Sequence, residues 1–420
     1  MNYLLKRSVL TAAVVGALTM GQVQANNVEV LHWWTSGGEA RAVGVLKDLM
    51  EERGHQWRDF AVAGGGGESA MTVLRSRAVA GNPPVAAQIK GPDIQEWGSL
   101  GFLGEINTVA KEVGWQALLP EVIIEAMQHD GDYVAVPVNV HRVNWFWANP
   151  EVLAAAGVDD MPTTWEAFFE AAEAIKEAGY IPLAHGGQPW QDATVFESML
   201  LGIGGVDFYR QAMVELDQEA LASDTMIEVL KNFKRLRDYM DPNAPGREWN
   251  AATQMVVNGQ AAFQIMGDWA KGELTAAGLT AGEDFLCMGV PGTDHTFTYN
   301  VDSLAMFKVS GARAREAQLD LARLSMEPAF QEAFNLAKGS IPARMDLDMS
   351  RFDSCAVKSM ADFKASADAG TLVPSMAHGM AVSSDAQGAI FDVVTNYFNS
   401  RRMTAEEAAE RLARAVRAAG

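Results

Sequence analysis

The sequence predicts an α/β protein with two lobes, each a sheet flanked by helices, and a chain that crosses between the lobes several times. In the first third of the chain, short apolar segments alternate with segments of helical periodicity, and small-residue turns separate them, which is typical of a mainly parallel sheet. The 420 residues exceed what one hydrophobic core usually supports. Neither a sequence repeat nor a low-complexity linker divides the chain, which favours lobes formed by repeated crossing.

The N-terminal segment has the features of a secretory signal peptide. Lys6 and Arg7 precede a short apolar run, and the segment ends in the small-residue pattern V-Q-A at 23–25. We expect cleavage after Ala25, and because Asn26 rather than Cys follows, we expect no lipid attachment. The run is too short to span a bilayer, and no later apolar run approaches that length. The mature protein is therefore predicted to be exported in soluble form.

Charge and composition exclude several classes of partner. The net charge of −20 becomes −22 when Lys6 and Arg7 are removed with the signal peptide, which disfavours binding to nucleic acid. The acidic residues are spread along the chain, as in a well-solvated globule. With two cysteines and seven dispersed histidines, the sequence predicts neither a metal site nor a cofactor.

The two cysteines, Cys287 and Cys355, have two possible states. In an oxidising compartment they could form one disulfide that closes a long loop, or they could remain two buried thiols. Both states stay open, because a sequence does not show whether two sulfur atoms meet.

The first elements form strand, turn and helix units. Each apolar segment ends in small or polar residues, and a helical pattern begins directly after them. The predicted strands cover 28–34, 57–61 and 84–89, and the predicted helices cover 39–53, a segment from Ser69 and a segment around Trp97.

The middle and the end of the chain differ from this pattern. An apolar stretch at 133–139 that is interrupted by proline predicts a crossover between lobes, and Thr163 or Thr164 is expected to cap a helix. The remaining predictions are a strand at 143–148 with a short helix after it, long helices to about 258, a strand and turn at 259–269, extended structure at 296–307, and helices from 312 that end in an amphipathic helix at 405–419.

Catalytic motifs are missing from the sequence. It contains no G-x-S-x-G, H-E-x-x-H or G-x-x-x-x-G-K-[ST] pattern. The glycine run 64–67 lacks the following Lys-Ser/Thr, so a plain glycine loop is favoured over a phosphate site. A glycosidase with two carboxylates stays open as an alternative because 53 acidic residues are present, although no local pattern selects a pair.

Aromatic and charged residues recur at the turns that follow predicted strands. Ligands of open α/β sheets bind beyond the carboxyl ends of the strands. Taken singly, each such residue has an ordinary structural explanation, for example a core tryptophan or a solvated lysine. Together they indicate a neutral polyol site, because charged groups bind several hydroxyls and indole faces cover the C–H face of a sugar. These residues are Trp33, Trp34, Glu39, Lys90, Trp269, Asp302, Lys338 and His378.

Other tryptophans have different expected roles. Trp145 and Trp147 lie two residues apart on a predicted strand, so both should point into the core. Trp165, in the first turn of a helix, is also expected to pack. Trp190 ends a polar, glycine-rich loop, and contact with a ligand and simple packing are equally compatible with that position.

Longer segments of the chain resemble sugar-binding proteins of ATP-driven import systems, in the extracellular solute-binding family that includes maltose-binding proteins. The likeness covers essentially the whole mature chain and is greatest to periplasmic glucose/mannose-binding proteins of Gram-negative bacteria. The segments are LHWWTSGGEA (31–40), QIKGPD (88–93), AVPVNVHRVNWFWAN (135–149), PTTWEAFFEAA (162–172), NGQAAFQIMGDWA (258–270), YNVDS (299–303), LAKGSIPAR (336–344) and AHGMA (377–381).

The resemblance implies a site, a fold and partners. The eight turn residues given above would be ligand contacts, with Trp33 or Trp34 and Trp269 against ring faces, while Gln88, Asn300 and Arg344 would support them or touch the sugar. The expected lobes are 26–136 plus about 300–343, and about 137–299 plus 344–420. A ligand would close the hinge between them, and the closed form would deliver it to a membrane permease without covalent chemistry.

The resulting hypothesis is a periplasmic, monomeric receptor of an ABC importer that binds glucose, with mannose or galactose as alternatives. A secreted glycosidase and a receptor of the same fold for an oligosaccharide are the competing hypotheses. The exact sugar and its anomer, the permease and any oligomer leave no signature in the sequence.

Overall fold

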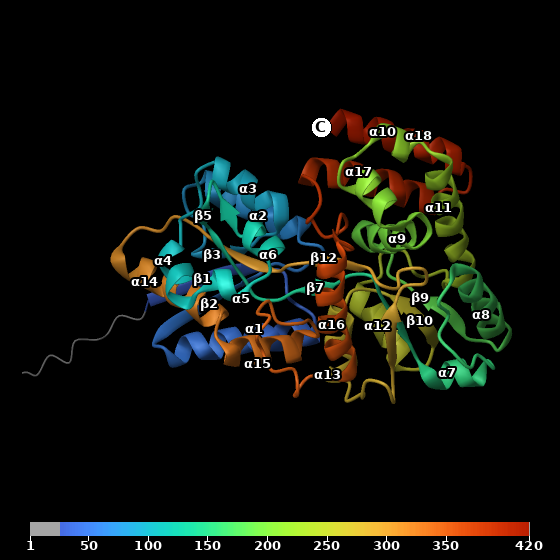
Figure 1. The fold of residues 1–420 in the computed structure, drawn as a ribbon, viewed down its shortest axis with the longest axis horizontal. Helices are drawn as coiled ribbons and strands as arrows, with labels where there is room; N and C mark the ends of the chain where they lie inside the picture. The colour runs from blue at the N-terminus through green and yellow to red at the C-terminus, as the bar shows by residue number, and fades with distance from the viewer. Residues whose placement is uncertain (1–25, 420) are drawn as a thin grey trace, which may run out of the picture.

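The computed structural model describes residues 26–419, which form two lobes side by side (Figure 1). The predicted signal peptide lies outside the described residues. Within residues 26–419, no helix is long and apolar enough to cross a membrane.

The first lobe contains a five-stranded sheet with the order β2-β1-β3-β13-β6. The first three strands are parallel, whereas β13 runs antiparallel to both of its neighbours. The strands are β1 (Asn26–His32), β2 (His55–Ala61), β3 (Ala86–Gln88), β6 (Ala135–Pro137) and β13 (Ser303–Met306). The other elements of this lobe are α1 (Gly37–Glu52), α2 (Glu68–Val79), α3 (Gly91–Ser99), α4 (Asn107–Val113), α5 (Trp115–Leu118), α6 (Glu121–Ala126), β4 (Gln128–His129), β5 (Asp132–Tyr133), α14 (Ala312–Ser325) and α15 (Pro328–Lys338).

The second lobe contains a four-stranded sheet with the order β11-β8-β10-β9. Strand β8 is antiparallel to both neighbours, and β10 is parallel to β9. The strands are β8 (Trp145–Ala148), β9 (Ile181–Ala184), β10 (Ala261–Ile265) and β11 (Leu286–Gly289). The other elements are α7 (Pro150–Ala155), α8 (Trp165–Glu177), α9 (Pro189–Met213), α10 (Gln218–Leu221), α11 (Asp224–Arg235), η1 (Leu236–Tyr239), α12 (Trp249–Val257), α13 (Trp269–Ala276), α17 (Ser384–Asn399) and α18 (Ala405–Ala419).

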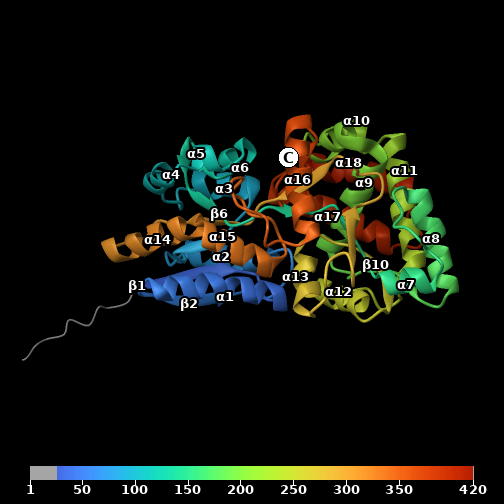
Figure 2. The same cartoon turned by 60° about the horizontal axis from the view of Figure 1, so that its bottom comes forward.

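A small third sheet joins the lobes. Its order is β14-β12-β7, formed by β7 (His141–Arg142), β12 (Phe297–Asn300) and β14 (Leu372–Pro374). The chain leaves β6 for β7 and later returns from β12 to β13, so two crossings run side by side. The backbone N–H of Val138 donates to Asp302 O at 2.9 Å across this pair. The lobes are therefore linked by several adjacent strands rather than by one linker (Figures 1 and 2).

Each lobe has its own apolar core. The first core includes Val30 and Leu304 from the five-stranded sheet and Phe334 from α15. The second core includes Phe146 and Phe263 from the four-stranded sheet. The predictions of buried packing roles for Trp145, Trp147 and Trp165 are confirmed, since their exposed fractions are 1%, 1% and 5%.

Most predicted elements are present, one of the two expected helix caps is confirmed, and two expectations are corrected. The helix cap is Thr164, whose side chain accepts from Ala167 N. The expectation of a mainly parallel sheet is wrong: all three larger sheets are mixed, because strands that return from the other lobe enter antiparallel. The helical patterns expected to about 258 are interrupted by β9, which was not predicted, whereas the chain from 312 is largely helical as expected and contains one short strand, β14. Both strands are only three or four residues long, too short to show a period.

A disulfide joins the two cysteines and decides the question that the sequence left open. Cys287 lies on β11, and Cys355 lies on α16 (Ser354–Ala369), with 6.1 Å between their Cα atoms. Helix α16 packs Met360 and Phe363 into the first core. The bond therefore ties a helix that packs in the first core to the sheet of the second lobe.

Removal of this bond should destabilise the protein. A Cys287→Ser/Cys355→Ser variant should lose about 4 kcal/mol of unfolding free energy on the loop-entropy relation, since the cysteines are 68 residues apart. Urea unfolding curves measure the loss. Reductant should shift the curve of the parent protein and leave the double variant unchanged; a parent curve that does not respond to reductant would contradict the pairing.

Candidate functional site

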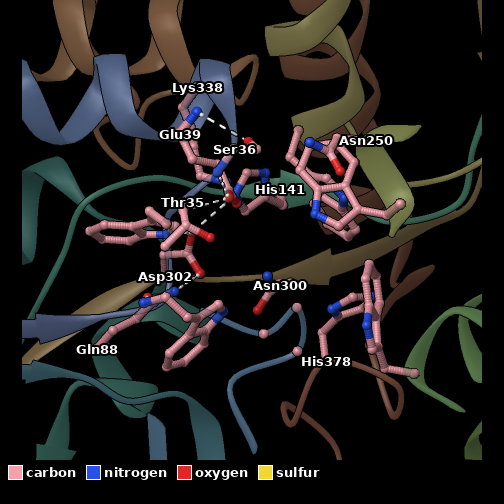
Figure 3. Close-up of a pocket in the computed structure, with 18 of the residues that line it drawn as sticks. Thr35, Ser36, Glu39, Gln88, His141, Asn250, Asn300, Asp302, Lys338 and His378 are labelled. Carbon is pink, nitrogen blue, oxygen red and sulfur yellow. Dashed lines mark hydrogen bonds and ion pairs between the residues drawn. The ribbon is translucent and has the colours of Figure 1, made fainter. Parts of the chain in front are cut away.

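A cavity of about 310 Å³ lies between the lobes, where turns at the ends of strands from both sides meet. Figure 3 shows Glu39, Lys338 and Asp302 facing the same space as His378 and Asn300. All eight predicted contact residues line this cavity: Trp33, Trp34, Glu39, Lys90, Trp269, Asp302, Lys338 and His378. The structure thus brings them together, and their contact with a ligand remains a prediction.

The start of helix α1 holds one buried ion pair. Ser36 caps the helix and forms a capping box with Glu39. Oε2 of Glu39 accepts from the backbone N–H groups of Thr35 and Ser36, each at 3.2 Å. Its Oε1 lies 2.9 Å from Nζ of Lys338, which is only 2% exposed at the C-terminal end of α15. The cap fixes the carboxylate, and the carboxylate in turn fixes the ammonium group at the cavity.

Asp302 lies at the centre of the polar wall, in the crossing between β12 and β13, and is 2% exposed. Its carboxylate has partners on several segments of the chain. They are Gln88 Nε2 at 3.1 Å, Asn139 Nδ2 at 3.2 Å, His141 Nε2 at 3.0 Å, Trp34 Nε1 at 3.3 Å and Lys90 Nζ at 3.5 Å.

The charge of Asp302 is stabilised by this surrounding. Burial disfavours the ionised carboxyl, but the positive charges of Lys90 and His141 outweigh burial and hold its pKa well below the usual range. Burial lowers the pKa of Lys90, and Asp302 opposes that effect. Removal of this one carboxylate would leave the buried Lys90 cation without its counter-charge and would take one of two carboxylate partners from His141.

His141 connects the site to the second lobe. Its Nε2 faces Asp302, while its Nδ1 is hydrogen-bonded to Asp268, the residue directly before α13. Burial lowers the pKa of His141, but the two carboxylates outweigh burial and raise it. The imidazole is therefore a cation held between Asp302 and Asp268, on the strand that joins the lobes.

His378 is a neutral ring on the other side of the cavity. Burial and the nearby charges of Lys90 and His141 hold its pKa well below the usual value. The hydroxyl of Thr194 donates to Trp190 O at 2.8 Å, so its oxygen accepts from Nε2–H of His378 at 3.0 Å. Nδ1 then keeps a lone pair that can accept a hydrogen bond from a ligand hydroxyl.

Glu197 on α9 fixes the loop that contains His378. Within this loop, the hydroxyl oxygen of Ser375 accepts a hydrogen bond from the backbone N–H of His378 at 3.1 Å, so Glu197 and Ser375 both hold the loop in place. Burial raises the pKa of Glu197 to about 7, although the hydrogen bonds that its carboxylate accepts oppose this shift. The carboxylate of Glu197 accepts from Ser375 Oγ at 2.6 Å, Met376 N at 2.9 Å, Ala377 N at 3.1 Å and Tyr209 OH at 2.9 Å.

Indole rings form the apolar walls. Nζ of Lys90 lies 5.2 Å from the centre of the Trp33 ring. The rings of Trp269 and His378 are 4.7 Å apart, and Trp190 lies 5.8 Å from His378. Trp190 lines the cavity, so its polar loop places it at the site and not in a remote core. Apolar ring faces thus stand beside the charged groups of Asp302 and Lys90.

Of the three residues expected to support the site, two line the cavity and one does not. Gln88 and Asn300 line the cavity, and Oδ1 of Asn300 is buried without a hydrogen-bond partner among the described residues. An orphan acceptor of this kind needs a donor, which a ligand hydroxyl can provide. The expectation for Arg344 is wrong: it does not line the cavity, because its guanidinium is held by Asp346 and the backbone of Met326.

Several lining residues were missed by sequence reasoning. His141 lies between the predicted crossover at 133–139 and the predicted strand at 143–148, and a histidine beside an extended crossing is the signal that could have identified it. The glycine run was expected to be a plain loop, yet it borders the cavity. The missed lining residues are Thr35, Ser36, Ala63, Gly64, Gly65, Gly66, His141, Glu248, Trp249 and Asn250.

The buried charges of the site neutralise one another. Lys338 pairs with Glu39, Lys90 with Asp302, and the His141 cation with Asp268. A charged ligand would disturb this balance at a cost in desolvation. Donors and acceptors in fixed positions between aromatic faces suit a neutral ligand that has several hydroxyl groups.

Comparison with known proteins gives a consistent family. The model of a family described as bacterial extracellular solute-binding protein matches residues 44–317. A probable sugar-binding periplasmic protein of Brucella suis is 48% identical and aligned over 100% of both chains. An uncharacterized ABC transporter extracellular-binding protein of Pyrococcus horikoshii is 31% identical over 90% of this chain and 85% of its own.

The fold also matches solved structures. A chitin oligosaccharide binding protein superposes with a TM-score of 0.78 over 94% of this chain and 99% of its own, at 19% sequence identity. At this identity the likeness concerns the fold, and it confirms the predicted two-lobed α/β class.

The buried Glu197 predicts a pH dependence of stability. Its pKa of about 7 in the folded protein lies above the ordinary 4.5, so its contribution to stability is full below pH 4.5 and is lost as the pH rises through about 7. The difference corresponds to about 3 kcal/mol. In Glu197→Gln, the unfolding free energy should therefore fall less between pH 4.5 and pH 7.5 than in the parent.

Urea midpoints at four pH values measure this effect. Glu96→Gln, on the exposed face of α3, is the matched control and should follow the parent at every pH. Parallel curves for Glu197→Gln and the parent would contradict the assignment.

Proposed function

We propose that this chain, which belongs to the bacterial extracellular solute-binding protein family, is the periplasmic receptor of an ABC-type importer and binds one monosaccharide, glucose, between its lobes. The observation that supports this most directly is the charge-balanced cavity, in which polar groups of both lobes stand beside indole faces. A pyranose presents the matching surface, with hydroxyls around its edge and C–H groups on its faces.

The size of the cavity favours a single sugar ring. At about 310 Å³ it lies at the lower end of the range for small-molecule sites. The Brucella suis relative is named a probable sugar-binding protein, and the name of the Pyrococcus horikoshii relative includes an ABC transporter. A longer ligand is the second candidate, since a chitin oligosaccharide binding protein has the same fold.

The proposed mechanism is closure about the strands that join the lobes. We assign 26–136 plus about 300–343 to one moving unit and about 137–299 plus 344–420 to the other. Lys90 and Asp302 would hold the sugar from one side, and Trp269 and His378 from the other, so that only the closed form makes every contact. The closed monomer would then be the form that the membrane permease recognises.

Enzymatic hydrolysis fits this cavity poorly. A glycosidase needs a carboxylic acid whose raised pKa keeps a proton available for the leaving group. Asp302, the carboxylate at the centre of the cavity, has its pKa shifted in the opposite direction. Both carboxylate oxygens of Glu39 already have partners within the protein, an ammonium group and two backbone N–H groups.

Calorimetry against a small sugar panel tests the proposal. We expect saturable binding of glucose, weaker or comparable binding of galactose and mannose, and no binding of maltose. Tryptophan fluorescence should change with the same stoichiometry, because five indoles line the cavity. Tight binding of maltose without glucose would favour the oligosaccharide receptor, and release of nitrophenol from aryl glycosides would favour the enzyme.

Replacement of the central carboxylate should abolish most of the affinity. Asp302→Asn removes a charged acceptor and leaves Lys90 without its counter-charge, so glucose should bind about 10- to 150-fold more weakly. Asp48→Asn, on the exposed face of α1, is the control and should bind like the parent. Circular dichroism verifies the fold of both variants; a folded Asp302→Asn with parental affinity would remove Asp302 from the site.

A further inference from the structure

The glycine run 64–67 packs against tryptophans of the cavity. It lies in the loop between β2 and α2 of the first lobe. A Cβ atom built on Gly65 would lie 2.8 Å from Cζ2 of Trp190, and one on Gly66 would lie 3.1 Å from its Cγ. A Cβ on Gly67 would lie 2.8 Å from Cζ2 of Trp33. Backbone and indole rings therefore approach so closely that a side chain has no room.

Trp190 belongs to the opposite lobe and is held there rigidly. It is the second residue of α9, and its ring is 7% exposed. Its Nε1 donates to Gln188 Oε1 at 3.0 Å, and its carbonyl accepts from Thr194. The ring also contacts Trp269 and His378, with centroid distances of 6.4 and 5.8 Å. A fixed ring cannot turn aside to make room for a side chain.

We propose that the contact of Gly65 and Gly66 with Trp190 holds the two lobes closed over the ligand, and that closure requires the absence of a side chain at Gly65. This inference rests on the proposed function, because it treats the structure as the closed, ligand-competent form. It assigns a role in affinity to residues that need not touch the sugar.

The two glycines differ in a way that isolates this contact. Gly66 has a φ of 81°, so a substitution there would strain the backbone as well as collide with the ring. Gly65 lies outside the left-handed region, so alanine suits its own backbone. The three atoms nearest to a Cβ at Gly65 all belong to the indole of Trp190, at 2.8, 2.9 and 3.0 Å. A Gly65→Ala variant therefore tests the contact between lobes rather than the conformation of the loop.

Closure explains why such a contact changes affinity. If a ligand binds only the closed form, its apparent dissociation constant rises as the population of that form falls. A steric collision in the closed form lowers this population and therefore raises the apparent dissociation constant. The open form has no such collision, since its lobes are apart. Overpacked contacts of one methyl group typically lower an equilibrium about tenfold or more.

The experiment compares glucose binding of Gly65→Ala with that of the parent and of Gly44→Ala. Gly44, on α1, has no atom within 4 Å of a built Cβ and is the matched control. We expect the affinity of Gly65→Ala to fall about tenfold, with an unchanged melting temperature of the unliganded protein. The decrease in radius of gyration on glucose addition should be smaller than in the parent. Gly44→Ala should match the parent in affinity and in this decrease, and its melting temperature should rise slightly because alanine stabilises the middle of α1.

A double-mutant cycle with Trp190→Ala identifies the partner. If the indole is the obstacle, Gly65→Ala should cost nothing further in the Trp190→Ala background. An equal loss in both backgrounds, or parental affinity of Gly65→Ala, would overturn the proposal. A parent protein that binds no sugar of the panel would instead contradict the proposed function, so the two failures are distinguishable.

Discussion

The buried carboxylate of Asp302 is the interaction on which the rest of the site depends. An ionised group at 2% exposure is tolerated only when it is paired and hydrogen-bonded. Its partners come from the turn after β1, the end of β3, the crossing before β7, and β7 itself. Satisfying this one charge therefore brings together turns that lie far apart in the sequence, and those turns form the polar wall of the cavity.

A second consequence of the buried Asp302 carboxylate concerns how the two lobes are linked. His141 sits between Asp302 and Asp268, and Asp268 directly precedes Trp269, an indole of the opposite wall. The polar wall and an aromatic wall are thus linked by one imidazole ring on a connecting strand. The site and the strands that join the lobes are therefore parts of the same hydrogen-bonded unit.

The sequence was informative about residues whose position follows from local pattern. All eight predicted contacts line the cavity. Trp33, Trp34 and Lys90 follow parallel strands that end at one edge of the first sheet, whereas Lys338 is the last residue of helix α15. His141 was missed because it acts through Asp268 and Asp302, which are 127 and 161 residues away. The short strands β9 and β14 and the Cys287–Cys355 pair depend likewise on partners distant in sequence, and periodicity contains no information about them.

The glycines at the contacts between lobes matter to the buried charges because they decide how closely the lobes approach and therefore whether water is excluded. A Cβ on Gly38 would lie 2.9 Å from the backbone of Gly272, so the start of α1 also meets α13 without an intervening side chain. Close backbone approach excludes water, and exclusion of water strengthens every hydrogen bond inside the cavity. The ion pairs around Asp302 and Glu39 are useful to a neutral ligand only in such a dry space, because water would otherwise compete for the same donors. The charged residues in the cavity therefore depend on the small residues at the lobe contacts, which keep water out. A side chain that holds the lobes apart should weaken binding by admitting water to the polar contacts, even where it does not touch them.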